Sequence, residues 1–405
     1  MIAENRRDRA HTDWILIGLV MAVAIFGIFA VSVATYSPAS SSDVPLLNHI
    51  ANSSFALRQG LYVLVAPIIL SVVMNIPLAL LRKRARTIYI LTNVLLLVVW
   101  VFNRATGVKA WLDTLWGFTI QPSEFAKLAM ILVLALELSR EDKPMSTFKS
   151  FARIAVTMGL PAFTIAASGE MGSLLVIIFL FIIMLFFSGV DMRLLIGMAA
   201  VGITLLLLLY AYMTLSGSDN YRLVRILSFL DPEAYSSSGA YQQTQSKIAI
   251  GSGGLTGIGT FVDGAMSQLN YVPADWTDFI FATIGEAFGF IGCTALLFVY
   301  FLILLRMLYL ALHTYDRFGM LIIAGVIGML LFHVFENVGM CTGLMPITGI
   351  PLPFVSYGGS NMVTNMGGVG LVLNVTKHRS LSVGVPTPQL THGRRRFMRT
   401  PRGRA

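Results

Sequence analysis

Charged side chains are scarce in this chain of 405 residues, of which Asp, Glu, Lys and Arg make up only 12%. In soluble domains about a quarter of the residues are charged. A soluble protein of this length would expose a large surface to water, and 12% charged residues are too few to cover it. The scarcity therefore excludes a soluble globular enzyme. Cysteine is scarce too. Cys293 and Cys341 both stand in apolar surroundings, which excludes a disulfide framework and gives no metal-ligand spacing.

The chain has apolar sequence instead, with 56% hydrophobic residues and a mean hydropathy of +0.76. A helix crosses a bilayer core with about 20 mainly apolar residues. Ten runs are candidates for such helices: Trp14–Tyr36, Leu61–Leu81, Ile88–Phe102, Ser123–Leu138, Ile154–Ala167, Ser173–Gly189, Leu194–Leu215, Phe279–Leu305, Gly319–Val338 and Phe354–Val375. The sequence therefore predicts an all-α polytopic membrane protein, a bundle of about ten transmembrane helices whose first is not a cleaved signal peptide.

The basic residues are unevenly distributed between the connections. With the N-terminus inside, 22 of the 29 Lys and Arg residues fall on the cytoplasmic side and 7 fall outside, as the positive-inside rule expects. An even number of spans puts both termini in the cytoplasm. We expect a cytoplasmic tail (1–13), a transmembrane domain (14–376) with a long extracytoplasmic loop (216–276), and a basic cytoplasmic tail (377–405). Such a tail is more typical of anionic lipid than of nucleic acid as a partner.

Ionisable residues inside or at the rim of a span are costly and mark candidate functional sites. Glu124 and Lys127 lie three residues apart, on one face of a helix that Pro122 opens. A solvated surface ion pair is the alternative interpretation. The apolar sequence that follows the pair argues against it.

Asp278 ends the long loop and opens another apolar span, and Glu286 lies eight residues further along, about two turns deeper on much the same face. A helix N-cap at Thr277 or Asp278 is the simpler alternative. The functional interpretation is a general base at the boundary of water and lipid, where desolvation raises the pKa of a carboxyl group.

Two further segments are irregular. Ser168–Ser173 form a polar hinge, in which Glu170 is interpreted as a turn residue. Asn337–Ser360 contain prolines and glycines that a regular helix does not accommodate. Irregular backbone at membrane depth is tolerated where it is buried in protein or lines a wet cavity, so we expect a re-entrant segment capped by Ser356–Ser360.

Five of the seven cations on the outer side stand out against the positive-inside trend. A phosphate-bearing ligand would account for them, because guanidinium and ammonium groups bind phosphate well. The residues alone thus predict an outer-face site for an anionic amphiphile, and the five cations are Arg58, Lys127, Arg222, Arg225 and Lys247.

With these residues identified, the chain resembles the SEDS family (shape, elongation, division and sporulation) of RodA/FtsW-like proteins, as a divergent member. The resemblance runs from about Asp13 to Val375. Its five motifs occur in order: Gln121–Glu124 with Lys127, Tyr241–Ser246, Ile248–Gly254, Thr277–Phe281 and Pro346–Ser360.

The resemblance implies a peptidoglycan glycosyltransferase that polymerises lipid II into glycan strands on the outer face of the bacterial cytoplasmic (inner) membrane. Such enzymes serve elongation, division or sporulation, beside a class B penicillin-binding protein. It also implies that Asp278 is catalytic and that undecaprenyl pyrophosphate is the leaving group. A divalent cation, Mg²⁺ or Mn²⁺, is a candidate companion of the pyrophosphate, with no ligand cluster visible. The expected substrate-binding and pyrophosphate-binding residues are Arg58, Glu124, Lys127, Arg225, Lys247, Glu286, Ser356 and Ser360.

The chain also departs from the family pattern. Trp276 stands where the family usually has His, and Ala274 stands where it has an acidic residue. Ala110 replaces an Arg, and Ala287 replaces the second Glu of a pair. Since Asp278 and the other charged residues remain, an active enzyme is favoured. The alternatives are a lipid II flippase, which moves the substrate without transforming it, and a non-catalytic scaffold that activates its penicillin-binding partner. The absence of an internal repeat argues against a transporter.

Overall fold

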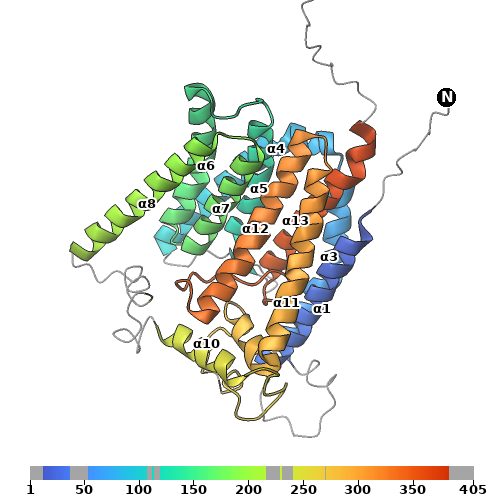
Figure 1. Ribbon diagram of the computed structural model, residues 1–405, viewed down its shortest axis with the longest axis vertical. Helices are drawn as coiled ribbons and strands as arrows, with labels where there is room; N and C mark the ends of the chain where they lie inside the picture. The colour runs from blue at the N-terminus through green and yellow to red at the C-terminus, as the bar shows by residue number, and fades with distance from the viewer. Residues whose placement is uncertain are drawn as a thin grey trace, which may run out of the picture.

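The computed structural model describes residues 12–36, 53–106, 112–113, 119–215, 229, 240–269 and 271–382. Within them the chain forms a bundle of helices (Figure 1), with a single antiparallel pair of short strands, β1 (Leu112–Asp113) and β2 (Thr119–Ile120). The helices are α1 (Trp14–Ala34), α3 (Ser54–Asn75), α4 (Leu78–Thr106), α5 (Pro122–Leu138), α6 (Phe148–Ala167), α7 (Met171–Phe187), α8 (Met192–Leu215), α10 (Tyr241–Ser252), α11 (Ile280–Leu312), α12 (Arg317–Thr342) and α13 (Gly359–Ser382).

Each of the ten predicted spans overlaps one of these helices, so the all-helical membrane fold is confirmed. Six helices of the described part are long and apolar enough to cross a membrane, namely α1, α3, α4, α6, α11 and α12. Helix α7 and the first part of α8 are shorter apolar helices. The number of spans and the cytoplasmic placement of both termini stay predictions. Part of the predicted long loop is helical, because α10 lies within it.

Helix α12 lies at the centre of the bundle and is the most buried of the six. It packs against α5, α7, α11 and α13. Small residues allow this close approach: a Cβ atom at Gly328 would lie 3.0 Å from the Cα of Leu180 in α7. Gly325 is equally close to side chains of α5 and α7. A polar residue on α12 is therefore surrounded by protein on several sides.

Residues 343–358, between α12 and α13, form the irregular segment that the sequence predicts. We call it the re-entrant segment. Its backbone is buried in protein, with Leu352, Phe354 and Ser356 fully buried, as irregular backbone inside a membrane protein must be. The helix boundaries predicted on both sides of this segment are wrong. Helix α12 continues to Thr342 rather than ending near Asn337, and the last helix begins at Gly359 rather than at Phe354.

Helix α11 is broken at Gly289, whose backbone has φ +64 and ψ −164. The break leaves backbone groups without partners inside the helix, and the loop after α10 satisfies them. The N–H of Ile258 donates to the carbonyl of Glu286 at 3.0 Å, and the N–H of Phe290 donates to the carbonyl of Gly254 at 2.9 Å. The first two turns of α11 are thus joined to the loop by backbone hydrogen bonds.

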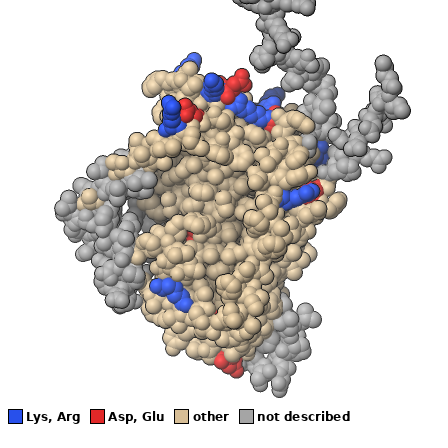
Figure 2. All heavy atoms as spheres, in the orientation of Figure 1, with Lys and Arg blue, Asp and Glu red and all other residues tan. Residues whose placement is uncertain are grey.

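The charged surface residues gather at one end of the molecule (Figure 2), and a broad uncharged belt separates them from the other end. Arg82 pairs with Asp316, Arg306 with Asp13, and Arg317 with Asp142 at this end. We call it the charged end. All three arginines were predicted to lie on the same, cytoplasmic side, and they do lie together.

Candidate active site

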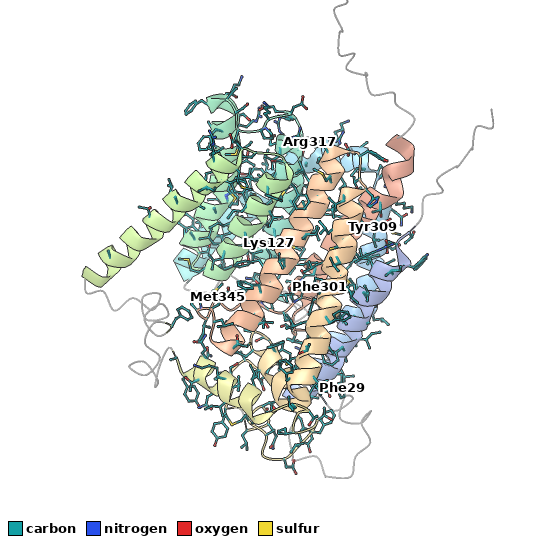
Figure 3. All side chains as sticks on the ribbon, in the orientation of Figure 1. Phe29, Lys127, Phe301, Tyr309, Arg317 and Met345 are labelled. Atoms are coloured by element: carbon teal, nitrogen blue, oxygen red, sulfur yellow. The ribbon has the colours of Figure 1, made fainter. Side chains whose placement is uncertain are left out.

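Helix α5 carries Glu124 and Lys127 into the interior of the bundle. The Nζ atom of Lys127 donates to Oε1 of Glu124 at 2.7 Å, and the two side chains are only 1% and 4% exposed. Figure 3 shows Lys127 in the middle of the bundle, far from Arg317 at the charged end. The alternative of a solvated surface ion pair is therefore wrong.

His333 on α12 is a second partner of Lys127, with 2.9 Å between its Nε2 atom and Nζ. An ammonium group only donates hydrogen bonds, so Nε2 accepts and the imidazole proton sits on Nδ1. That proton points to the carbonyl oxygen of Pro351 at 3.3 Å. His333 therefore joins Lys127 to the re-entrant segment, through a neutral imidazole whose tautomer follows from its two partners.

Two more residues on the same face of α12 hold the re-entrant segment. Glu336 accepts a hydrogen bond from Thr348 at 2.9 Å. Asn337 donates to the main-chain oxygens of Ile350 and of Asp278, both at 2.7 Å. Spacings of three and four residues place these side chains together with His333. Helix α12 is thus the element that holds the re-entrant segment against Asp278.

Asp278 lies half-buried in the turn before α11. The N-cap residue of α11 is Phe279, which makes no side-chain cap hydrogen bond, so the prediction of an N-cap at Thr277 or Asp278 is wrong. Gly349 of the re-entrant segment has φ +72, and a Cβ atom there would lie 3.3 Å from Oδ2 of Asp278. The carboxylate therefore lies beside the re-entrant backbone at Gly349.

Ser356 and Ser360 bind main-chain groups around this centre. The hydroxyl of Ser356 donates to the carbonyl of Thr277 at 2.6 Å and accepts from the N–H of Leu352 at 2.7 Å. The hydroxyl of Ser360 accepts from the N–H of Gln121 at 3.2 Å. Both serines were predicted to bind substrate. In this conformation they connect the segments that carry Asp278 and Glu124.

Glu170 has a larger role than the predicted turn residue. Its Oε2 atom accepts hydrogen bonds from Gln121 at 2.9 Å, from Ser173 at 3.1 Å and from Ser123. The hinge before α7 is thereby joined to the first turn of α5, next to the Glu124–Lys127 pair.

The predicted cations are spread more widely. Arg58 is exposed on α3, whose residues Phe55 and Tyr62 contact Tyr357 with ring centroids 5.2 and 6.0 Å away. Lys247 is exposed on α10, with its Nζ atom 3.6 Å from a Cβ atom built on Gly343. Arg225 lies outside the described residues. Lys247 therefore borders the re-entrant segment, Arg58 lies on a helix that contacts it, and both side chains are exposed.

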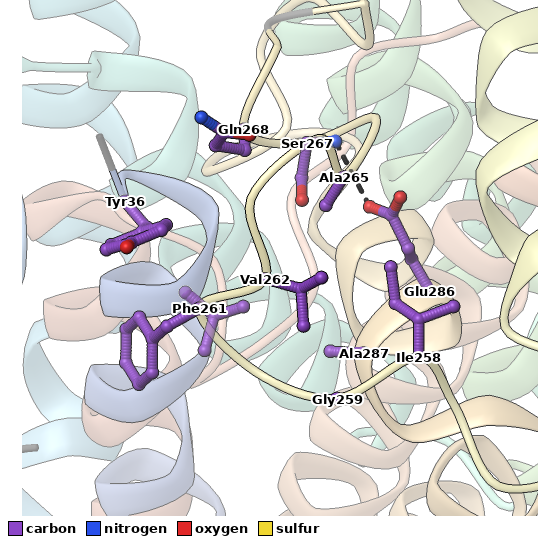
Figure 4. A pocket seen from close by; sticks show the side chains of 11 residues that line it. Tyr36, Ile258, Gly259, Phe261, Val262, Ala265, Ser267, Gln268, Glu286 and Ala287 are labelled. Carbon is purple, nitrogen blue, oxygen red and sulfur yellow. Dashed lines mark hydrogen bonds between the residues drawn. The ribbon is translucent and has the colours of Figure 1, made fainter. Parts of the chain in front are cut away.

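Glu286, expected to bind substrate, holds a loop instead. It accepts from the N–H groups of Met266 at 2.6 Å and Ser267 at 3.1 Å, and it lines a small pocket beside that loop (Figure 4). Both carboxylate oxygens of this residue are thus engaged by the loop before Asp278.

Asp275 is a buried carboxyl group that the sequence interpretation missed. It is fully buried, and within the described residues neither of its oxygens has a hydrogen-bond partner of good geometry. Burial raises its pKa to about 8, and the negative charge of Glu286 adds to the rise. The nearby N–H groups of Asp275 and Trp276 oppose part of it. Asp275 is therefore largely protonated at neutral pH.

His333 and Glu336 were also missed, although the sequence contained a signal for them. Both are ionisable residues inside the predicted span Gly319–Val338, and such residues mark functional sites by default. The described residues contain no group of three or more His, Cys, Asp or Glu side chains that could hold a metal ion.

Comparisons with known proteins identify the family of this chain. The matching family model, FTSW_RODA_SPOVE, describes cell cycle proteins and covers residues 13–381. Peptidoglycan glycosyltransferase MrdB of Escherichia coli strain K12 is 32% identical over 375 residues, which cover 92% of this chain and 96% of that protein. Stage V sporulation protein E of Bacillus subtilis strain 168 is 33% identical over 328 residues, covering 80% of this chain and 87% of that protein.

A solved chain from a peptidoglycan synthase complex, described for its coordination of polymerization and crosslinking, has a similar fold. It superposes with a TM-score of 0.73 at 27% identity, covering 91% of this chain and 98% of that one. The family match spans nearly the whole chain and the related proteins are similar along almost their full length. The chain therefore belongs to the FtsW, RodA and SpoVE family of cell cycle proteins, the SEDS family.

Proposed function

We propose that this protein is a peptidoglycan glycosyltransferase that polymerises lipid II into glycan strands, with Asp278 as the general base. The names of its relatives support the glycosyltransferase class. The observation that carries the residue assignment is the position of Asp278, a half-buried carboxylate that faces the re-entrant segment at Gly349.

The surroundings of Asp278 fix its position before substrate arrives. Asn337 holds its main-chain oxygen, and Ser356 holds the preceding carbonyl of Thr277. A base that is already in place gains from proximity, because little motion is needed to bring it to the reacting hydroxyl.

The proposed step is a displacement at a sugar carbon. Asp278 takes the proton from the 4-hydroxyl of one lipid II as that oxygen forms a bond to the anomeric carbon of the growing chain. The bond from this carbon to the pyrophosphate breaks, and undecaprenyl pyrophosphate leaves with the electron pair. Positive charge near the departing oxygens stabilises this transition state.

Arg58 and Lys247 are the described cations best placed to supply that charge directly, because their side chains are exposed. Lys127 is too deeply buried for contact with the pyrophosphate in this conformation, since Glu124 and His333 surround its ammonium group. We assign Lys127 an electrostatic role, in which its buried positive charge favours the departing anion without touching it. The described residues contain no cluster of carboxylates and histidines that would hold a metal ion by itself. A divalent cation that accompanies the pyrophosphate stays a prediction.

The cellular setting belongs to the same proposal. We place the protein in the cytoplasmic membrane of a bacterium, with Asp278 on the outer face and the charged end in the cytoplasm. A class B penicillin-binding protein is the proposed partner. The similarity to a chain of a peptidoglycan synthase complex supports this choice.

The test is polymerisation of lipid II by the purified protein, alone and with a class B penicillin-binding protein. Wild type should make glycan strands, and Asp278→Asn should lower the rate about 100-fold to 10,000-fold, as expected for loss of a general base. Asp263→Asn is the matched control, because Asp263 is exposed on the preceding loop. It should leave the rate unchanged.

Other outcomes would contradict the proposal. Normal polymerisation by Asp278→Asn would remove the base assignment. A wild-type protein that stays inert with its partner, yet activates that partner's crosslinking, would favour the scaffold. Vesicles that flip labelled lipid II without making polymer would favour the flippase.

A further inference from the structure

The contact between Lys127 and His333 joins the ion pair on α5 to the helix that holds the re-entrant segment. Glu124, the other partner of Lys127, lies one turn away on the same helix. It neutralises the ammonium charge, but it cannot fix Lys127 relative to any other element. His333 is on α12, so the 2.9 Å contact from its Nε2 atom to Nζ is what positions the ammonium group across the bundle.

The same imidazole also contacts the re-entrant segment. Its Nδ1 atom is 3.3 Å from the carbonyl of Pro351, which directly follows Ile350. One turn further along α12, Asn337 binds both Ile350 and the main chain of Asp278. His333 and Asn337 therefore connect Lys127 and Asp278 to adjacent residues of the re-entrant segment, Pro351 and Ile350.

The long side chain of Lys127 needs such a partner. A lysine ammonium is a point charge on a flexible four-carbon stem, and its effect on a departing anion depends on where it is held. A small displacement of a charged group can change a rate by about 100-fold. Nothing in the covalent structure of α5 sets the distance from this charge to Asp278.

We infer that His333 is a positioning residue that fixes the ammonium group of Lys127 relative to Asp278, and this inference builds on the proposed function. A neutral imidazole suits the task because it accepts from Lys127 and donates to Pro351 at the same time. A histidine that only filled space would not need both partners.

Two substitutions separate positioning from packing. His333→Gln keeps one acceptor for Lys127 and one donor for Pro351, because the glutamine side chain has both groups. His333→Leu keeps an apolar side chain of moderate size and neither hydrogen bond. His313→Leu is the matched control, because His313 is exposed at the end of α11.

The measurement is lipid II polymerisation with separate kcat and KM. His333→Leu should lower kcat at least about tenfold with KM changed less than about threefold, because His333 is only 1% exposed and we infer that it acts through Lys127. His333→Gln should restore kcat to within about threefold of wild type. His313→Leu should match wild type. Equal kcat for His333→Leu and wild type, or a loss in His333→Gln as large as in His333→Leu, would overturn the inference.

A thermal double-mutant cycle tests the contact without any enzymatic assay. If His333 holds Lys127, the loss of stability in the double variant His333→Leu, Lys127→Met should be smaller than the sum of the two single losses. Additive losses would contradict the inference. An inert wild-type protein with a non-additive cycle would instead contradict the proposed function alone.

Discussion

Helix α5 carries a buried carboxylate near each of its ends, and the two have opposite surroundings. Glu124 faces one ammonium group that is itself buried. Glu137, 3% exposed, receives Arg86 at 2.9 Å, Arg140 at 3.1 Å and Arg153 at 3.0 Å. These arginines are 30% to 53% exposed. The charge of Glu124 is therefore neutralised by one buried cation, whereas Glu137 pairs with three arginines that remain in contact with water.

The difference separates two uses of an ion pair. At the charged end, arginines that keep contact with solvent lose little hydration, so each pair contributes little and any one can be replaced. In the interior, both ions of the pair are desolvated and each depends on the other. An interior pair is poor at stabilising a fold, and its position beside the re-entrant segment points to a role in the reaction.

The largest expected effect comes from breaking the interior pair. Lys127→Met leaves Glu124 buried without its cation, which should reduce the free energy of unfolding by about 3–5 kcal/mol. Lipid II polymerisation should be lost as well. Thermal unfolding in detergent and a glycan-strand assay would measure the two effects.

Glu124→Gln combined with Lys127→Met is the control for that experiment. Removing both charges removes the uncompensated ion, so much of the stability should return. Activity should not return. Recovery of polymerisation in the double variant would mean that the interior pair serves only the fold.

The next prediction compares two glycines with positive φ angles. Gly349 lies in the re-entrant segment and Gly189 follows α7 near the charged end. Gly349→Ala places a Cβ atom 3.3 Å from Oδ2 of Asp278, at φ +72. Gly189→Ala has a similar φ of +78, and its Cβ atom meets nothing within 4 Å. Both should lose about 1–2 kcal/mol of stability from the left-handed backbone.

Their activities should differ, because only Gly349 faces the proposed base. We expect Gly349→Ala to slow polymerisation about tenfold or more and Gly189→Ala to retain the wild-type rate once the protein is folded. Equal activities would indicate that Asp278 tolerates displacement and is not held for catalysis.

Breaking the ion pairs at the charged end should reduce stability and activity less than breaking the interior pair does. Glu137→Gln leaves three arginines that can turn to water, so we expect a loss of about 1–2 kcal/mol. The loss should shrink at high salt, because exposed charges are screened. Polymerisation should change less than about threefold. A loss as large as that of Lys127→Met would remove the distinction between the two regions.

Two carboxyl groups should make stability depend on pH, with opposite signs at the two ends. Folding raises the pKa of Asp275 from 3.8 to about 8. The stability linked to its proton is therefore full below pH 3.8 and is lost as the pH rises through about 8. Asp275→Asn should remove this decline from a plot of thermal stability against pH.

Glu141 at the charged end provides the opposite case. Hydrogen bonds from Ser150 and Arg153 lower its pKa below 4.5. Its contribution is present above pH 4.5 and is lost as the pH falls through the lowered value. Glu141→Gln should flatten only the acid side of the same plot. An unchanged alkaline decline in Asp275→Asn would assign that decline to another group.

Much of the fold was predictable from sequence, because apolar runs and proline-rich and glycine-rich breaks are local signals. The pattern around Pro351 predicted buried irregular backbone, and the structure has it. Boundaries were less predictable: Phe354 is apolar enough for a helix, yet it packs into the re-entrant segment.

The site was predicted in part. Glu124, Lys127 and Asp278 were recognisable because charge at the rim of a span is costly. His333 and Glu336 carry the same signal, since both are ionisable residues inside a span. Their partners needed three-dimensional information, because nothing in the order of residues shows that α12 faces α5. Burial also changed the interpretation of Glu286, whose loop partners Met266 and Ser267 are distant in sequence.

The break in α11 at Gly289 has a consequence for how the chain enters a membrane. A helix with unpaired backbone groups is unstable in lipid, so α11 depends on the backbone of residues 254–259. That loop precedes α11 in the chain and is synthesised before it. The loop that binds the open backbone groups of α11 is therefore already synthesised when α11 enters the membrane. A circular permutation that placed residues 254–259 after α11 should insert poorly.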